Sequence, residues 1–129
     1  MPSVGSDDVS GIPAAAAAAA AADLIVLQIG SDRSLETEGH DRVNISFSDA
    51  QLALVAAVTA AAPAGVPVVA MVFSGGAMDV TPLLANARVG GVLICGQPSI
   101  QVVGSADVLF GRTPDGRAVA PAARMSQMT

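Results

Sequence analysis

The chain has no lysine, and its six basic residues are arginines that stand singly along 129 residues. Against them stand 11 aspartates and glutamates, so the formal net charge at pH 7 is −5. Proteins that bind nucleic acid or an anionic membrane surface carry clustered Lys and Arg, because these side chains neutralise phosphates. The sequence therefore predicts neither a nucleic-acid partner nor a membrane partner.

Aromatic residues and cysteine are also scarce, with no tryptophan, no tyrosine, three phenylalanines and one cysteine. Large aromatic rings supply flat apolar platforms for ligands such as sugars. Any platform of that kind would have to come from another domain. Cys95 cannot form an internal disulfide, and its position in the apolar run GGVLICG predicts a buried, unreactive thiol.

No signal peptide or transmembrane segment is visible in the sequence. Asp7 and Asp8 occupy the place where a secretory signal carries basic residues, and no arginine precedes Arg33. The alanine run at 14–22 leads into the apolar residues LIVL, but alanine is only weakly apolar and Asp23 interrupts the stretch. The sequence leaves the compartment undetermined.

An apolar content of 52% over 129 residues is sufficient for one hydrophobic core, and therefore for a single domain. Residues 1–12 are rich in Ser, Asp and Gly without periodicity, which predicts a disordered N-terminal segment. Residues 118–129, rich in Ala, Met and Ser, predict a disordered tail. The predicted domain occupies residues 13–117.

Strands and helices alternate within that domain. Apolar runs rich in branched residues predict buried strands over residues 23–30, 66–73 and 89–95. Between and before them, proline positions and capping residues predict helices over 13–22, from 49 onwards, and from 81 to 86 or 87. This alternation predicts parallel strands joined by right-handed crossovers, and so a layered α/β sandwich with a mainly parallel sheet.

The second helix starts with a capping box, Ser48-Asp-Ala-Gln51. In such a box the Ser48 hydroxyl accepts a hydrogen bond from the backbone N–H of Gln51, and the Gln51 side chain reaches back to Ser48. Thr81 and Pro82 predict a cap and a first-turn proline for the third helix.

Ligands of parallel α/β sheets bind beyond the carboxyl ends of the strands. Three segments lie at those ends, at residues 31–42, 74–79 and 96–104. The first, named the acidic loop, contains four carboxylates: Asp32, Glu36, Glu38 and Asp41. One of them could serve as a general acid if burial or a neighbouring charge raised its pKa, whereas a solvated acidic surface is the plainer interpretation.

The remaining polar features predict structure more than chemistry. His40 is the single histidine and has no metal-ligand spacing around it, so we assign it no chemistry and predict no metal site. Asp41 and Arg42 are expected to form an ion pair that shapes the loop. Ser74-Gly75-Gly76 lacks a phosphate-binding pattern, which predicts a tight turn and no nucleotide cofactor.

Three stretches, taken together and in order, resemble the C-terminal domain of glycoside hydrolase family 3, a family of β-glucosidases and β-xylosidases. They cover almost everything between Asp23 and Arg117. The first has an E-G-x-D-R-like element, the second an SGG turn, and the third an A-D-x-L-F-G element followed by G-R. They read IGSDRSLETEGHDRVNISFSDAQLALV, PVVAMVFSGGAMDVTPLLANARVGGVLICGQP and ADVLFGRTPDGR.

The resemblance implies an α/β sandwich packed against a TIM-like barrel, with the active site between them. It implies that the barrel supplies the nucleophilic aspartate and that the acidic loop supplies the acid/base. Carried onto this sequence, the acid/base role falls on Glu36, with Glu38 as the alternative register. The implied activity is hydrolysis of O-glycosyl bonds in β-glucosides or β-xylosides by a retaining mechanism, on a carbohydrate substrate and with no cofactor.

The sequence also departs from the family pattern. It contains no barrel, and GQPSIQVVGSAD stands where the family has a Gly-rich segment after the third strand. We therefore expect a fragment that is inactive alone, with substrate-binding residues that this sequence does not identify. The alternative is a non-catalytic carbohydrate-binding or interaction module derived from the same domain.

Overall fold

A computed structural model describes residues 4–97 and 105–118. The chain divides into two compact units, Met1–Gln97 and Pro98–Thr129, which are described separately below. Apart from Ala118, the predicted disordered tail lies outside the described residues, as does most of the third strand-end segment. Disorder of residues 1–12 stays a prediction; the described part of that stretch contains turns stabilised by Ser6 and Asp8.

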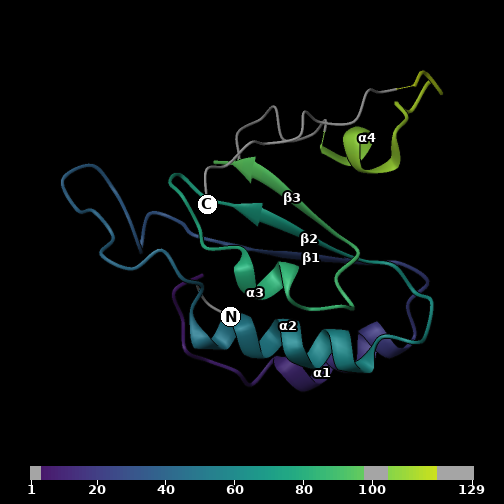
Figure 1. The fold of residues 1–129 in the computed structure, drawn as a ribbon, viewed down its shortest axis with the longest axis horizontal. Coiled ribbons are helices and arrows are strands. Elements are labelled where there is room, and N and C mark those ends of the chain that lie inside the picture. Colours follow the sequence, from purple (N-terminus) through teal and green to yellow (C-terminus); the bar gives the residue numbers. More distant parts are fainter. Residues whose placement is uncertain (1–3, 98–104, 119–129) are drawn as a thin grey trace. The chain divides into compact units, whose positions relative to one another are not determined.

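Within the described part of the first unit, three strands form a parallel sheet in the order β1-β2-β3 (Figure 1). They are β1 (Ile25–Gly30), β2 (Val68–Phe73) and β3 (Gly91–Gly96). Ile25 pairs with Val68 and Gly30 with Phe73, so β1 and β2 end level with each other. The predicted α/β class with a parallel sheet is confirmed.

Three helices lie on one side of this sheet, α1 (Ile12–Ala20), α2 (Asp49–Ala61) and α3 (Thr81–Leu84) (Figure 1). Alternate residues of β1 and β2 face them, because successive side chains of a strand point to opposite faces. Each buried Val, Leu or Ile side chain contributes about 1.5–3 kcal/mol. The inward-facing strand residues and the facing helix side chains form one core, which includes Ile25, Leu27, Ile29, Val55, Val58, Val68, Ala70, Val72 and Leu83.

One of the two hydrogen bonds predicted for the capping box at the start of α2 is present. Ser48 is the N-cap and accepts a hydrogen bond of 3.3 Å from the Gln51 N–H. The prediction that the Gln51 side chain returns to Ser48 is wrong, since its amide bonds to the backbone of Gly30 instead. Gln51 is 1% exposed, and a buried amide needs partners for both its oxygen and its nitrogen. A tertiary contact has replaced a local one.

The start of α3 also differs from its prediction. Val80 is the N-cap and Thr81 is already the first helical residue, so Thr81 is not the cap. The N–H of Thr81 donates instead to Asp79 Oδ1 at 2.9 Å. The helix ends at Leu84, two or three residues earlier than expected.

The described part of the second unit consists of α4 (Ser105–Phe110) and a turn. Gly111 follows the helix with φ +67°, and Arg112 then forms an antiparallel bridge with Ala118. An exposed ion pair of 2.7 Å between Asp115 and Arg117 closes the turn. Across residues 4–97 and 105–118, we find no helix with the length and apolarity that a membrane crossing requires.

Candidate active site

The acidic loop begins at a strand end that has little freedom to move. Gly30 has φ +146°, and an added Cβ there would overlap the carbonyl oxygen of Phe73 on the neighbouring strand. Gln51 accepts from Gly30 N at 2.8 Å and donates to Gly30 O at 3.0 Å. The next residue, Ser31, donates its N–H to the Phe73 carbonyl at 2.8 Å. These bonds fix the direction in which the loop leaves the sheet.

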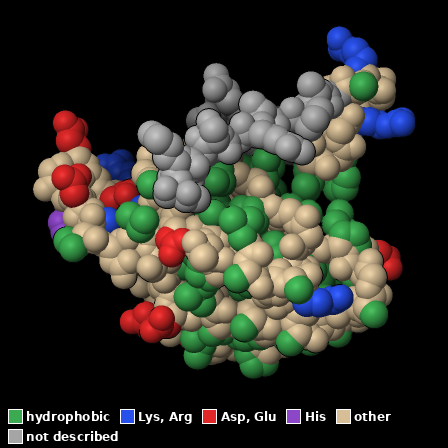
Figure 2. Space-filling model, viewed as in Figure 1, with side chains coloured by type: hydrophobic (Ala, Val, Ile, Leu, Met, Phe, Trp, Pro, Cys, Tyr) green, Lys and Arg blue, Asp and Glu red, His purple; other side chains and the backbone are tan. Residues whose placement is uncertain are grey.

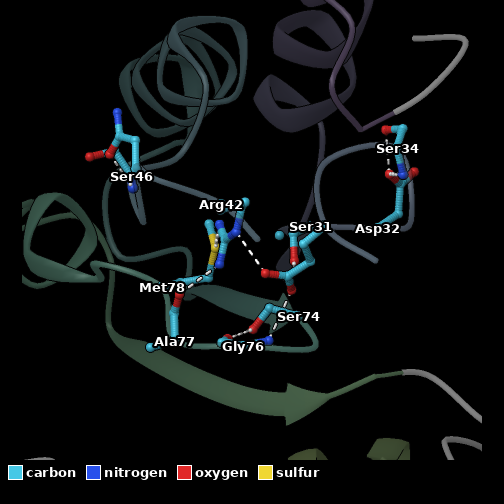
Figure 3. Close-up of polar contacts among 12 residues, drawn as sticks. Ser31, Asp32, Ser34, Arg42, Ser46, Ser74, Gly76, Ala77 and Met78 are labelled. Atoms are coloured by element: carbon cyan, nitrogen blue, oxygen red, sulfur yellow. Dashed lines mark hydrogen bonds and ion pairs between the residues drawn. The ribbon is translucent and has the colours of Figure 1, made fainter. Parts of the chain in front are cut away.

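Glu36 lies at this strand end and accepts hydrogen bonds from three donors. The Ser31 hydroxyl and the Gly76 N–H donate to Oε1 at 3.0 and 2.9 Å, and Arg42 Nε donates to Oε2 at 2.8 Å. Figure 3 shows Ser31 and Arg42, from the two ends of the acidic loop, close to Gly76 of the turn after β2. We call Glu36 and its three donors the carboxylate clamp. It joins the loop after β1 to the turn after β2.

Arg42 extends the clamp further along the segment between β2 and α3. Its side chain is 9% exposed, Nη2 donates to the Ala77 carbonyl at 2.7 Å, and Nη1 lies against Met78 Sδ (Figure 3). The predicted Asp41–Arg42 ion pair is wrong, because Arg42 pairs with Glu36 and Asp41 is exposed. Arg42 is directed to Glu36 and Ala77 by its own hydrogen bonds, and Asp41 is left in solvent.

The clamp favours the charged form of Glu36. The hydrogen bond from Arg42 is the main cause that lowers the pKa of Glu36; partial burial opposes the shift, and Ser31 and Gly76 add to it. Of the three donors, the guanidinium and the backbone N–H cannot accept a hydrogen bond from a protonated carboxyl. Protonation of Glu36 would therefore leave at least one donor without its acceptor.

The tip of the acidic loop, residues 37–40, has a different environment. Thr37 and His40 exchange two backbone hydrogen bonds of 3.1 and 2.8 Å, and Gly39 takes φ +80° in the turn between them. Glu38 and His40 are exposed there, and the red and purple side chains at that end of the molecule are visible in Figure 2. With the described residues, the Glu38 carboxylate forms no hydrogen bond or ion pair.

The four candidate carboxylates thus do not act as one cluster. Asp32 accepts hydrogen bonds from the N–H and hydroxyl of Ser34, which lower the pKa of Asp32 and stabilise a turn. Glu36 is the member of the set that contacts the second strand-end segment. Among residues 4–97 and 105–118, no three His, Cys, Asp or Glu side chains lie where they could hold a metal ion together.

The Ser74-Gly75-Gly76 turn forms as predicted, with the Ser74 hydroxyl donating to the Gly76 carbonyl at 2.8 Å. A Cβ at Gly75 would lie 2.6 Å from Gln97 Nε2 and 3.1 Å from Glu36 Oε1, so this glycine lets both side chains approach. Gln97, just after β3, was not identified from the sequence. Its position after a strand was the available signal.

Cys95 is half-buried and free, and burial raises the pKa of its thiol.

Comparisons with known proteins agree on one family. The family model for the glycosyl hydrolase family 3 C-terminal domain matches residues 6–127. A probable exo-1,4-β-xylosidase of Neosartorya fischeri is 38% identical over 117 residues, which cover 88% of this chain and 15% of that protein. β-D-xylosidase 3 of Arabidopsis thaliana is 39% identical over 98 residues, covering 74% of this chain and 12% of the relative.

Solved structures give the same result. A family 3 exo-β-xylosidase in complex with a xylobiose aziridine probe superposes with a TM-score of 0.73 at 34% identity, over 88% of this chain and 15% of that one. The β-glucosidase of Kluyveromyces marxianus in complex with glucose gives a TM-score of 0.68 at 31% identity, over 88% of this chain and 13% of that one. The chain thus spans about a seventh of these relatives. It belongs to glycoside hydrolase family 3 and corresponds to the C-terminal domain of that family's β-xylosidases and β-glucosidases.

Proposed function

We propose that this chain supplies the acid/base-bearing part of a retaining β-glycosidase, which hydrolyses O-glycosyl bonds of β-xylosides or β-glucosides when a barrel domain completes the site. Relatives at 38% and 39% identity are named as β-xylosidases, and the chain covers only 15% and 12% of them. The rest of such an enzyme would supply the nucleophile. The isolated chain is expected to have no turnover.

The observation that carries the proposal is the acidic loop at the carboxyl end of β1. It presents carboxylates at the edge of the sheet where ligands of α/β folds bind. It is also built with a fixed base, through Gly30 and Ser31, and an exposed tip. A carboxylate presented in this way suits a site that a second domain completes.

The resemblance assigns the acid/base to Glu36, with Glu38 as the alternative register, and the geometry favours Glu38. A general acid must hold a proton before it donates it, and three hydrogen bonds to Glu36 stabilise the charged form. Glu38 is exposed at the tip. A domain packed over the tip would enclose this carboxyl within the completed site, facing the substrate.

In this mechanism the Glu38 carboxyl protonates the glycosidic oxygen as the leaving group departs. The nucleophilic aspartate of the barrel attacks the anomeric carbon from the opposite face and forms a glycosyl-enzyme. The Glu38 carboxylate then takes a proton from the water that hydrolyses this intermediate. A retaining mechanism of this kind places the two carboxyl groups about 5–5.5 Å apart, across the sugar.

A chimaeric enzyme tests the proposal. The 129-residue chain replaces the matching segment of the Neosartorya fischeri relative, and hydrolysis of nitrophenyl β-xyloside and β-glucoside is measured beside the chain alone. Glu38→Ala should lower turnover of unactivated xylosides by about 100-fold to 10,000-fold. With a dinitrophenyl leaving group, which needs no proton, added azide should restore turnover and give a β-glycosyl azide.

Rescue of Glu36→Ala instead would return the acid/base role to Glu36. A folded chimaera with no activity on either sugar would contradict the enzymatic proposal and favour the non-catalytic module.

A further inference from the structure

We propose that Glu36 and Arg42 are positioning residues, which hold the two ends of the loop tip and so fix the direction in which Glu38 is presented. The inference rests on the proposed function only in naming the Glu38 carboxyl as the group positioned. It assigns to an arginine and a glutamate a role that requires no contact with the substrate or the reacting atoms.

The first step of the argument is the placement of the pair along the chain. Glu36 immediately precedes the tip and Arg42 lies two residues beyond it, so their 2.8 Å contact closes the tip into a short loop. Inside that closure, Thr37 and His40 exchange their backbone bonds and Gly39 adopts φ +80°. Closing a short chain segment at its ends removes much of its conformational freedom. Glu38 lies within this closed turn.

The second step is what the pair is attached to. Glu36 accepts from the Gly76 N–H and Arg42 donates to the Ala77 carbonyl, so both ends of the tip are bonded to consecutive residues of one segment. That segment is itself held to the acidic-loop side by a 3.0 Å backbone bond from Asp79 N–H to the Ile45 carbonyl. The clamp therefore fixes the tip relative to the end of β2, and not only relative to itself.

The third step concerns the type of side chain. Arg42 uses Nε, Nη1 and Nη2 on three separate groups, Glu36, Met78 and Ala77. A lysine offers one ammonium on a flexible stem and cannot match a planar fork with three directions. The clamp also explains the glycine at position 76. An added Cβ there would lie 3.2 Å from Glu36 Oε2, so a larger residue would crowd the carboxylate.

The test uses the whole 129-residue chain and needs no activity. In NMR spectra recorded across pH, the Gly76 amide shift should follow the ionisation of the Glu36 carboxylate, with a midpoint below that of an ordinary glutamate. Arg42→Gln should raise this midpoint toward that of an ordinary glutamate, because the main cause of the lowered pKa is gone, and it should increase the fast motion of the Gly39 amide in relaxation measurements. Arg42→Lys should restore the midpoint in part but not the order of the tip.

Arg33→Gln is the matched control, because Arg33 is an exposed arginine of the same loop, and it should leave both readouts unchanged. A Gly76 amide that does not titrate with Glu36, or a tip that keeps its order in Arg42→Gln, would overturn the inference. In the chimaera, Arg42→Gln should lower kcat about 100-fold for activated and unactivated xylosides alike, without azide rescue.

The two readouts separate the proposals. An inactive chimaera with a titrating Gly76 amide and a rigid tip would reject the enzymatic function and keep the clamp. An active chimaera whose kcat is unchanged by Arg42→Gln would reject the positioning role and keep the proposed function.

Discussion

Two carboxylates of one loop, two positions apart, occupy opposite environments. Glu36 is 18% exposed in its side chain and accepts from three donors, whereas Glu38 is exposed at the tip. The clamp consists of contacts between segments, and the tip consists of contacts within one turn. Residue type therefore does not distinguish these two glutamates. The number of their hydrogen-bond partners does.

The largest expected effect comes from the strand end below the clamp. Gly30→Ala places a Cβ 2.7 Å from the carbonyl carbon of Phe73, at a backbone φ that alanine rarely adopts. Since the obstacle is backbone of the adjacent strand, we expect a loss of more than about 4 kcal/mol and a chain that does not fold stably. Circular dichroism and thermal unfolding measure this directly.

Gly39→Ala is the matched control at the tip. Gly39 also has a positive φ, of +80°, but a Cβ there meets nothing within 4 Å. Its cost should be only the conformational one, about 1–2 kcal/mol. Equal losses at the two glycines would remove the distinction between a packed base and an open tip.

The second effect concerns Gln51, the buried amide that pairs with both backbone groups of Gly30. Gln51→Leu keeps most of the volume but leaves the Gly30 N–H and carbonyl without partners. We expect a loss of about 2–4 kcal/mol in the free energy of unfolding. Urea denaturation should show a lower midpoint at an unchanged slope. Gln28→Leu, at an exposed position of β1, should change stability by less than about 0.5 kcal/mol.

The third prediction uses acid to separate the clamp from the tip. The folded-state pKa of Glu36 is lowered, chiefly by Arg42, so its contribution to stability is present above the unfolded-state pKa of about 4.3. That contribution is lost as the pH falls through the lower, folded-state value. Unfolding midpoints between about pH 7 and pH 3 should therefore fall less steeply in Glu36→Gln than in the unchanged chain. A parallel pH profile in the variant would show that the clamp does not contribute to stability.

How far the sequence predicts this arrangement depends on the distance over which each contact forms. The continuous apolar run at 23–30 predicts β1 to within two residues, because burial of a strand is visible in its local sequence. The sequence predicts that Arg42 pairs with its neighbour Asp41, whereas in the structure its partner is Glu36. The Glu36–Gly76 bond spans 40 residues, so the pattern of either segment alone could not reveal it.

Gln51 illustrates the same limit at a helix start. The spacing from Ser48 to Gln51 predicts a local cap, and the Ser48 half of that prediction is confirmed. The Gln51 amide had two possible destinations, and the sequence describes only the nearer one. The strand end at Gly30 is preferred because both of its backbone groups are buried there and both need a partner.

The smallest expected effect is the most informative about function. In the isolated chain, Glu38→Gln removes an exposed carboxylate that bonds to none of the described residues, so the free energy of unfolding should change by less than about 0.5 kcal/mol. The same substitution in the chimaera should produce the large kinetic loss argued above for Glu38→Ala. A substitution that leaves the free energy of unfolding unchanged but strongly lowers turnover identifies a residue that acts on the substrate. If Glu38→Gln destabilised the isolated chain as much as Glu36→Gln does, the tip would be part of the packed structure and the proposed division between the two glutamates would fail.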